Sequence, residues 1–131
     1  MKTSIFLFAS LLTIAAHSQT GSNYVKENYN KIDTTITMRD GVKLYTVIYV
    51  PKDRSQQYPI LMERTPYSSA PYGSANYASS ITANDSLMRD KYIYVNQDVR
   101  GRYMSEGVNE EVTPYIANKT SNKQVDESSD T

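Results

Sequence analysis

Residues 92–107 read YIYVNQDVRGRYMSEG, an apolar run that opens directly into a polar loop containing glycine. Residues 59–67, PILMERTPY, show the same change, because Thr65-Pro66-Tyr67 interrupts a second apolar run. Short apolar runs bounded by turn residues are typical of buried strands. In open α/β sheets, ligands bind at the edge where such strands open into loops. The two motifs therefore predict a functional site at that edge, built from a tyrosine, arginines and carboxylates.

The stretch before these motifs predicts a β-hairpin. Residues 32–38 alternate between apolar and polar side chains, which is the pattern of a half-buried strand. Residues 42–50 form a second run rich in β-branched and aromatic residues, and Pro51 ends it. Between the two runs, Asp40-Gly41 supplies a tight turn, because this dipeptide tolerates positive φ at low cost.

The order of the remaining elements indicates an α/β protein. A helix is expected at residues 81–90, with Asn84 or Asp85 as its N-cap, before the strand at residues 92–95. Two hairpin strands, a third strand, a helix and a fourth strand match the beginning of an α/β sheet. After Gly107 the chain is polar and shows no further apolar period. We therefore predict that residues 32–131 are a truncated N-terminal portion of an α/β domain.

The first residues resemble an export signal. Lys2 is followed by an apolar run at residues 5–16 and by small residues before Gln19, which predicts a signal peptide at residues 1–18, cleaved after Ser18. The apolar run is too short to span a bilayer, so no stable membrane insertion is expected. The mature protein would be secreted or periplasmic. Residues 19–31 are polar and predict a loose lead-in to the domain.

Composition excludes several kinds of chemistry. The chain has no cysteine, and its one histidine is His17, within the predicted signal peptide. A Ser-His-Asp triad, a Cys-His pair and a histidine or thiolate metal site cannot be built from the rest of this chain. We therefore expect no cofactor and no metal. The 14 basic and 14 acidic side chains balance, which gives no electrostatic signature of a nucleic-acid partner.

Tyr67 has two interpretations. Pro66 fixes its own φ and restricts Thr65, so the tyrosine leaves the strand in a defined direction. A phenol held at the edge of a sheet can donate a hydrogen bond to the oxyanion that develops in acyl transfer. The alternative is an ordinary loop tyrosine that packs beneath the loop rich in serine, alanine and tyrosine at residues 68–80.

The charged residues after the last strand also have two interpretations. Arg100 and Arg102 can form bidentate pairs with Asp98 and Glu106, and Gly101 permits a sharp backbone path between them. This arrangement predicts an ion-paired brace for the loop. The alternative is a carboxylate cluster that binds the amine of a substrate.

Ser105 is not expected to be a nucleophile. A nucleophile elbow requires Gly-x-Ser-x-Gly, because small flanking residues allow its strained turn. Gly107 occupies the second glycine position, but Tyr103 occupies the first. No histidine is available in the mature chain to activate the hydroxyl.

Taken together, the motifs resemble the N-terminal part of the X-Pro dipeptidyl-peptidase-like serine hydrolases. This family includes cocaine esterase, α-amino-acid ester hydrolases and glutaryl/cephalosporin acylases. The matching features are residues 38–44 (MRDGVKL), 64–67 (RTPY), 98–101 (DVRG) and 105–107 (SEG), in the same order and spacing. The resemblance extends over residues 32–131.

This resemblance implies an α/β-hydrolase that cleaves amide or ester bonds with a Ser-His-Asp triad. The family's tyrosine at the last position of Arg-x-Pro-Tyr donates to the oxyanion, which implies this role for Tyr67. For Asp98, Arg100 and Glu106 the resemblance supports a structural brace near the site. The family's nucleophile, aspartate and histidine follow the segment matched here, and none is present in this chain.

Two hypotheses follow from the sequence. The first is an N-terminal segment of an exported serine hydrolase that cleaves acyl-amino, peptide or ester bonds and is inactive by itself. Its partner in the full-length enzyme would be a small-molecule or peptide acyl substrate. The second is a small exported binding or interaction module without catalysis, because tyrosine-rich surfaces suit such contacts.

Overall fold

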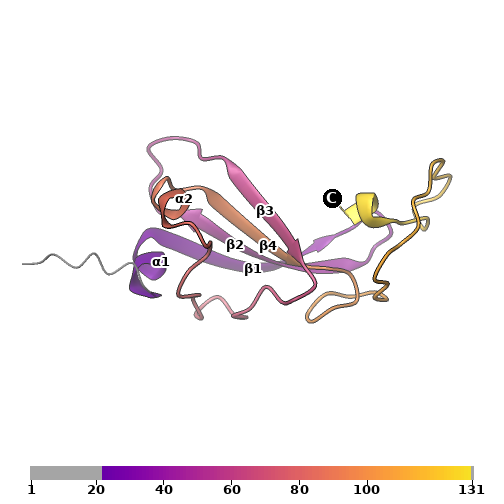
Figure 1. The fold of residues 1–131 in the computed structure, drawn as a ribbon, viewed down its shortest axis with the longest axis horizontal. Helices are drawn as coiled ribbons and strands as arrows, with labels where there is room; N and C mark the ends of the chain where they lie inside the picture. The colour runs from indigo at the N-terminus through magenta and orange to yellow at the C-terminus, as the bar shows by residue number, and fades with distance from the viewer. Residues whose placement is uncertain (1–21, 131) are drawn as a thin grey trace, which may run out of the picture.

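The structure is a computed structural model that describes residues 22–130. The predicted signal peptide therefore lies outside the described residues. The protein is built on a four-stranded mixed sheet with strand order β1-β2-β4-β3 (Figure 1). The strands are β1 (Tyr29–Thr37), β2 (Lys43–Pro51), β3 (Ile60–Thr65) and β4 (Ile93–Asp98). β2 is antiparallel to both β1 and β4, whereas β3 runs parallel to β4.

The predicted hairpin is present as β1 and β2. Its strands pair along their full length, from Tyr29 opposite Pro51 to Thr37 opposite Lys43. Gly41 in the connecting turn has φ +91°, a conformation that glycine adopts without steric cost. The turn thereby fixes the register of the hairpin, which in turn places Asp40 at one end of the sheet.

Within residues 22–130, three short helices accompany the sheet. They are α1 (Ser22–Asn28), α2 (Asp85–Arg89) and the 3₁₀-helix η1 (Glu127–Asp130). The helix predicted at residues 81–90 is shorter than expected, but Asn84 is its N-cap and accepts a hydrogen bond from the Ser86 amide at 2.9 Å. The α2 helix connects the parallel strands β3 and β4, as expected for a strand–helix–strand unit.

The described part of the segment expected to be a polar lead-in, residues 22–31, has regular structure. It forms α1 and the beginning of β1, because Val25 and Tyr29 are both fully buried although polar residues surround them in sequence. Tyr29 also donates a hydrogen bond through its hydroxyl to the Met88 carbonyl at 2.7 Å. Two apolar residues four positions apart are too weak a pattern to distinguish a one-sided helix from a loop.

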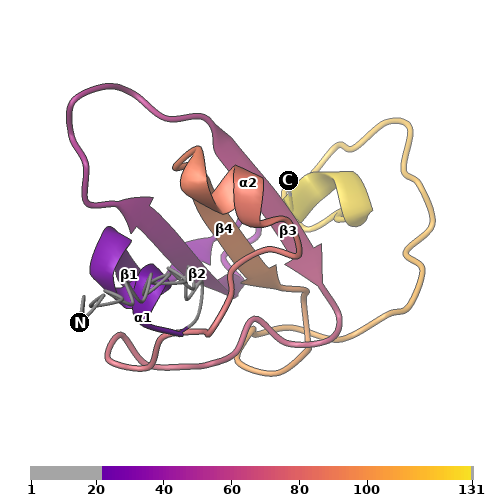
Figure 2. The ribbon, with the colours of Figure 1, turned by 60° about the vertical axis from the view of Figure 1, so that its left-hand side comes forward.

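The core lies on one face of the sheet, which we call the covered face. Its cluster joins α1, α2 and the loop before α2 to the strands, and comprises Val25, Tyr29, Val47, Tyr49, Ile81, Met88 and Tyr94. Figure 2 shows α2 in front of β4 and β3. The edge-on contact between the Tyr29 and Tyr94 rings, with centroids 6.3 Å apart, is part of this core.

The opposite face, which we call the open face, buries Leu44, Thr46 and Gln97 near the carboxyl end of β4. Farther along the strands, its aliphatic side chains are partly exposed. Strand register places Ile32, Ile48, Val95 and Met62 in one row across all four strands. The two outer members of this row, Ile32 and Met62, are 46% and 47% exposed. The isoleucine positions that suggested the buried side of the first strand therefore lie on the open face.

A buried lysine ties the long loop after β3 to the covered face. The Lys31 ammonium group pairs with Asp33 and donates to the carbonyls of Pro71 and Gly73. The Tyr45 hydroxyl donates to the same Asp33 carboxylate at 2.7 Å. The two bonds from Lys31 to Pro71 and Gly73 hold the far end of the loop that follows β3.

Candidate active site

The two motifs lie next to each other at one edge of the sheet. Because β3 and β4 are parallel and Thr65 is paired with Asp98, their carboxyl ends meet at this edge. Tyr67 follows β3 by two residues, and the loop at residues 99–107 follows β4. The structure thus brings both motifs together where the α/β topology predicts a site.

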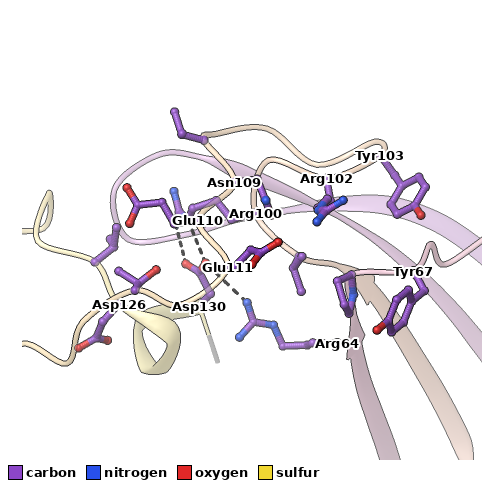
Figure 3. Close-up of a pocket in the computed structure, with 15 residues that line it drawn as sticks. Arg64, Tyr67, Arg100, Arg102, Tyr103, Asn109, Glu110, Glu111, Asp126 and Asp130 are labelled. Carbon is purple, nitrogen blue, oxygen red and sulfur yellow. Dashed lines mark hydrogen bonds and ion pairs between the residues drawn. The ribbon is translucent and has the colours of Figure 1, made fainter.

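A cavity of about 590 Å³ lies between these loops and the C-terminal segment. Figure 3 shows Tyr67 and Tyr103 at one end of this cavity and Asp126 toward the other. Its wall is strongly charged, with arginines and carboxylates on facing segments: Arg64, Arg100, Arg102, Glu110, Glu111, Asp126 and Asp130. Such a lining suits a polar ligand better than an aliphatic one.

Tyr67 has an exposed side chain on a fixed backbone. Its side chain is 84% exposed and borders the cavity. Its backbone amide donates to the Thr65 hydroxyl at 3.0 Å, across the intervening Pro66. The phenol can therefore meet a ligand oxygen in the cavity, and it is not packed beneath the following loop.

Asp98 occupies the last position of β4 and is fully buried. Its carboxylate accepts hydrogen bonds from the Ser69 amide at 2.6 Å, the Tyr72 hydroxyl at 2.9 Å and the Met104 amide at 3.3 Å. These donors come from both loops of the site. Asp98 therefore connects the two loops through hydrogen bonds instead of pairing with a neighbouring arginine.

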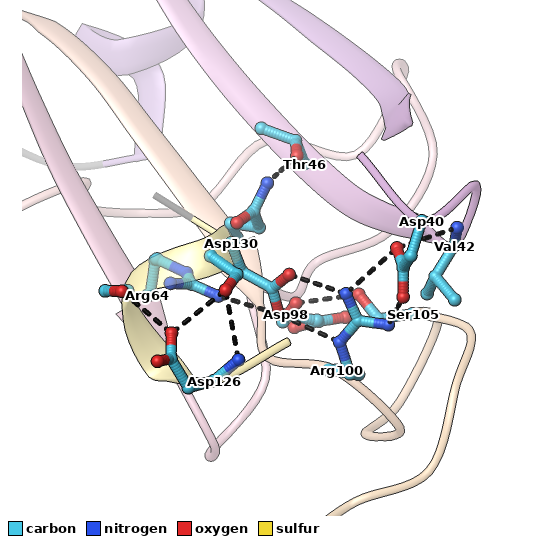
Figure 4. Close-up of polar contacts among 12 residues, drawn as sticks. Asp40, Val42, Thr46, Arg64, Asp98, Arg100, Ser105, Asp126 and Asp130 are labelled. Atoms are coloured by element: carbon cyan, nitrogen blue, oxygen red, sulfur yellow. Dashed lines mark hydrogen bonds and ion pairs between the residues drawn. The ribbon is translucent and has the colours of Figure 1, made fainter. Parts of the chain in front are cut away.

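Arg100 joins three distant parts of the chain. Its guanidinium forms bidentate contacts with Asp40 in the hairpin turn and with Asp130 in η1, as Figure 4 shows. The shortest contacts are 2.7 Å to Asp40 and 2.6 Å to Asp130. Hydrogen bonding to Arg100 also holds the pKa of the Asp40 carboxyl below its usual range. Asp130 additionally pairs with Arg64 of β3 at 3.6 Å.

Glu106 and Ser105 attach the second loop to the start of β2. The Glu106 carboxylate accepts from the Lys43 amide at 3.1 Å, and the Glu106 amide donates to the Lys43 carbonyl. The Ser105 hydroxyl accepts from the Tyr45 amide at 2.8 Å and donates to the Asp98 carbonyl at 2.7 Å. Both polar functions of Ser105 are thus used in holding the loop.

Gly101 permits the sharp turn of this loop. Its φ is +68°, and a Cβ atom at this position would collide with the backbone of Val108 and Asn109. A side chain is therefore excluded by space as well as by backbone conformation.

Four residues of the site were not singled out by sequence reasoning. Asp40 was interpreted as a turn residue, and Asp130 belonged to the polar segment after Gly107. Ser69 and Tyr72 belonged to the loop at residues 68–80. No local pattern could reveal them, because their partners lie 26 to 60 positions away in the sequence.

Within residues 22–130, no group of three or more histidine, cysteine, aspartate or glutamate side chains is arranged to hold a metal ion. In the same described segment, no helix combines the length and the apolar character needed to cross a membrane.

Comparison with known proteins identifies the family. The sequence profile described as X-Pro dipeptidyl-peptidase (S15 family) matches residues 40–129, from the hairpin turn to η1. This chain belongs to the X-Pro dipeptidyl-peptidase (S15) family. No curated protein sequence matched the chain.

Solved structures support the same assignment. An aminopeptidase from the marine sediment archaeon Thaumarchaeota archaeon is 32% identical, with a TM-score of 0.61 over 94% of this chain. An α-amino acid ester hydrolase, labelled with selenomethionine, is 33% identical, with a TM-score of 0.60 over 90% of this chain. The match covers 20% and 19% of those two chains, so this S15 family member spans about one fifth of their length.

The comparisons confirm the predicted family and fold class. The four-stranded sheet is that of the N-terminal part of an α/β-hydrolase, and the protein is a hydrolase segment by resemblance. The roles of Tyr67, Asp98, Arg100 and Glu106 remain predictions.

Proposed function

We propose that this chain is the N-terminal segment of an exported serine hydrolase and that Tyr67 is its oxyanion donor. The observation that carries this proposal is the exposed Tyr67 phenol, which borders the cavity at the carboxyl edge of the sheet on a backbone fixed by Thr65. The bonds cleaved would be peptide, acyl-amino or ester bonds. The names of the two solved relatives, an aminopeptidase and an α-amino acid ester hydrolase, support this substrate class.

In this mechanism a serine from outside the chain attacks the substrate carbonyl. The Tyr67 hydroxyl donates to the oxygen as negative charge develops there, together with a backbone N–H beside the serine. The donor is neutral, so the hydrogen bond gains strength as the carbonyl becomes an oxyanion. This differential stabilisation of the transition state accelerates the chemical step.

The charged cavity wall suggests how a substrate would be positioned. Arg102 lines the cavity with Tyr67, and Glu110 and Glu111 approach from the following segment. The glutamates supply negative charge that suits a substrate amine, and the arginines supply positive charge that suits a carboxylate.

The test is a chimera in which this chain replaces the matching fifth of the α-amino acid ester hydrolase. Tyr67→Phe removes one oxyanion donor and should lower kcat for an amino acid ester by about 100- to 1,000-fold. KM should change little, because the lost contact forms mainly in the transition state. Tyr103→Phe is the matched control, because Tyr103 is an exposed tyrosine of the same cavity and should retain activity within a few-fold. A Tyr67→Phe rate within a few-fold of the parent would contradict the oxyanion role.

The 131-residue chain alone should not turn over esters. It lacks a nucleophile elbow, and its one histidine lies in the predicted signal peptide. Hydrolysis of p-nitrophenyl esters that a serine-reactive fluorophosphonate abolishes would contradict this expectation.

Export rests on the N-terminal sequence. Residues 1–18 combine Lys2, an apolar run and small residues before Gln19. Expression with its own N-terminus should yield a product outside the cytoplasm that begins at Gln19, as N-terminal sequencing would show. A cytoplasmic product that retains Met1 would argue against export.

A further inference from the structure

The geometry points to Asp98 as the residue that positions Tyr67, an inference that rests on the proposed function. Tyr67 reaches the cavity from a loop, and a loop donor is effective only if its backbone is held in place. The contacts that hold this loop converge on the Asp98 carboxylate. Asp98 touches neither the cavity nor the Tyr67 ring in the contacts described above, so it acts as a positioning residue.

Both oxygens of the Asp98 carboxylate accept hydrogen bonds from the loop that contains Tyr67. Oδ1 accepts from the Ser69 amide at 2.6 Å, and Oδ2 accepts from the Tyr72 hydroxyl at 2.9 Å. These anchors lie two and five residues after Tyr67. On the other side, the Tyr67 amide itself is bound to the Thr65 hydroxyl. The tyrosine backbone is therefore held from both directions.

A relay of hydroxyl groups extends the anchor to the residue beside Tyr67. The Ser68 Oγ lies 2.9 Å from the Tyr72 hydroxyl and accepts from the Ala70 amide at 3.1 Å. Because the Tyr72 hydroxyl gives its one proton to Asp98, Ser68 must be the donor to Tyr72. The order of donation is thus Ser68 to Tyr72 to Asp98, with the buried carboxylate as the final acceptor.

The backbone directly after Tyr67 is strained, which explains the need for this anchor. Ser68 has φ +92°, a conformation that residues with a side chain rarely adopt. Such a residue persists only where its surroundings hold it, and strained residues of this kind cluster at functional sites. The hydrogen bonds of Ser68 and Ser69 provide that hold, and they aim the preceding tyrosine at the cavity.

Asp98 also connects the Tyr67 loop to the second loop that borders the cavity. Its third donor is the Met104 amide, next to Tyr103, and its own carbonyl accepts from Ser105. One buried side chain thus sets the position of both loops that border the cavity. An asparagine in this place would present an N–H to one of the donors, so a hydrogen bond would be replaced by a repulsive contact.

The kinetic test uses the same chimera. Asp98→Asn should lower kcat by about 100-fold with little change in KM, because displacement of a reacting group by about 1 Å costs that much. Tyr72→Phe removes one donor and leaves the carboxylate intact, so it should lower kcat by about 10-fold. Tyr45→Phe is the matched control, because it removes a similar hydroxyl–carboxylate bond to Asp33 and its ring contacts the Tyr72 ring. It should leave kcat within about twofold.

A double variant separates positioning from a general structural effect. If Asp98 acts through Tyr67, Asp98→Asn should have almost no further effect on kcat in the Tyr67→Phe background. An equal loss in both backgrounds would overturn the inference while leaving the oxyanion role intact. If Tyr67→Phe alone has no effect, the proposed function fails instead. The two failures are therefore distinguishable.

A second measurement tests the inference without the chimera, in case the chimera does not fold or has no activity. In the 131-residue chain, hydrogen exchange of the amides at residues 67–70 should become faster in Tyr72→Phe and Asp98→Asn but not in Tyr45→Phe. Should Asp98→Asn unfold the chain, Tyr72→Phe decides the result. Unchanged exchange at residues 67–70 in Tyr72→Phe would overturn the anchoring of the Tyr67 loop by Asp98.

Discussion

The two faces of the sheet are opposite in chemistry and in burial. On the covered face, the row Lys31, Tyr49 and Tyr94 is buried although each side chain ends in a polar group. On the open face, the neighbouring row that contains Ile32 and Met62 is aliphatic and nearly half exposed at both ends. Helices and loops from this chain cover the row of tyrosines and leave both ends of the Ile32–Met62 row accessible. Leu44, Thr46 and Gln97 are buried on that second face. Burial in this sheet therefore follows the position of the covering elements more closely than it follows the hydrophobicity of the strands.

Strand β3 shows the same contrast within one element. Ile60, Leu61 and Met62 are consecutive apolar residues, so they point to both faces of the sheet. Runs of this kind are typical of parallel strands that are buried on both sides. In this chain β3 is an edge strand, and Ile60 is 64% exposed. The strand has the composition of a central strand in the position of an edge strand.

The largest predicted effect comes from a charge placed on the covered face. Val47 is fully buried in the core, so Val47→Asp should lower the free energy of unfolding by at least about 4 kcal/mol. Ile32→Asp is the control on the open face and should change it by less than about 1 kcal/mol. Urea unfolding of the 131-residue chain, followed by circular dichroism, measures both. Equal losses would show that the two faces are not different in solution.

High pH should act selectively on the covered face. Burial and the hydrogen bond to Asp33 raise the pKa of Tyr45 to about 12, and burial also raises the pKa values of Tyr29, Tyr49 and Tyr94. As pH rises, the unfolded chain therefore loses its tyrosine protons before the folded chain does. The free energy of unfolding keeps its full value below pH 10 and falls as pH rises toward 12. The contribution of Tyr45 should be on the order of 1 kcal/mol over this interval.

Tyr45→Phe isolates this contribution. The variant should show a shallower loss of stability between pH 10 and pH 12 in urea unfolding experiments. The same slope in parent and variant would mean that Tyr45 titrates alike in the folded and unfolded chains.

The smallest effect on stability is expected on the open face. Met62→Lys should change the free energy of unfolding by less than about 0.5 kcal/mol, because the side chain is 47% exposed. It should nevertheless reduce self-association of the 131-residue chain, since a lysine on an edge strand opposes pairing with another edge. Sedimentation velocity measures the association. Strong destabilisation without a change in association would show that the face is covered in solution.

The sequence predicted the strands, the hairpin turn and the cap of α2 because each has a local cause. Asp40-Gly41 specifies its turn through backbone conformation, and Asn84 caps α2 through a neighbour two residues away. The covered side of the sheet was not predictable from the alternation around Ile32, because the cover comes from elsewhere in the chain.

The candidate site also has features that local sequence predicts and features that depend on distant residues. The edge position of Tyr67 followed from the end of an apolar run, and the adjacency of the two motifs followed from parallel strands. The partners of Arg100 could not be predicted from local sequence, because Asp40 and Asp130 lie 60 and 30 positions away. The anchoring of the Tyr67 loop by Asp98 could not be predicted either, because it depends on how a loop of 19 residues without regular structure folds back.

The bidentate contacts of Arg100 with Asp40 and Asp130 have a consequence for limited proteolysis. The segment between Gly107 and Asp126 is mostly exposed, and a protease that cut it would leave the terminal piece joined mainly by charge, through Asp130 to Arg100 and Arg64. Salt screens such contacts and leaves the sheet hydrogen bonds largely unaffected. The nicked protein would then behave as two parts whose association depends on ionic strength.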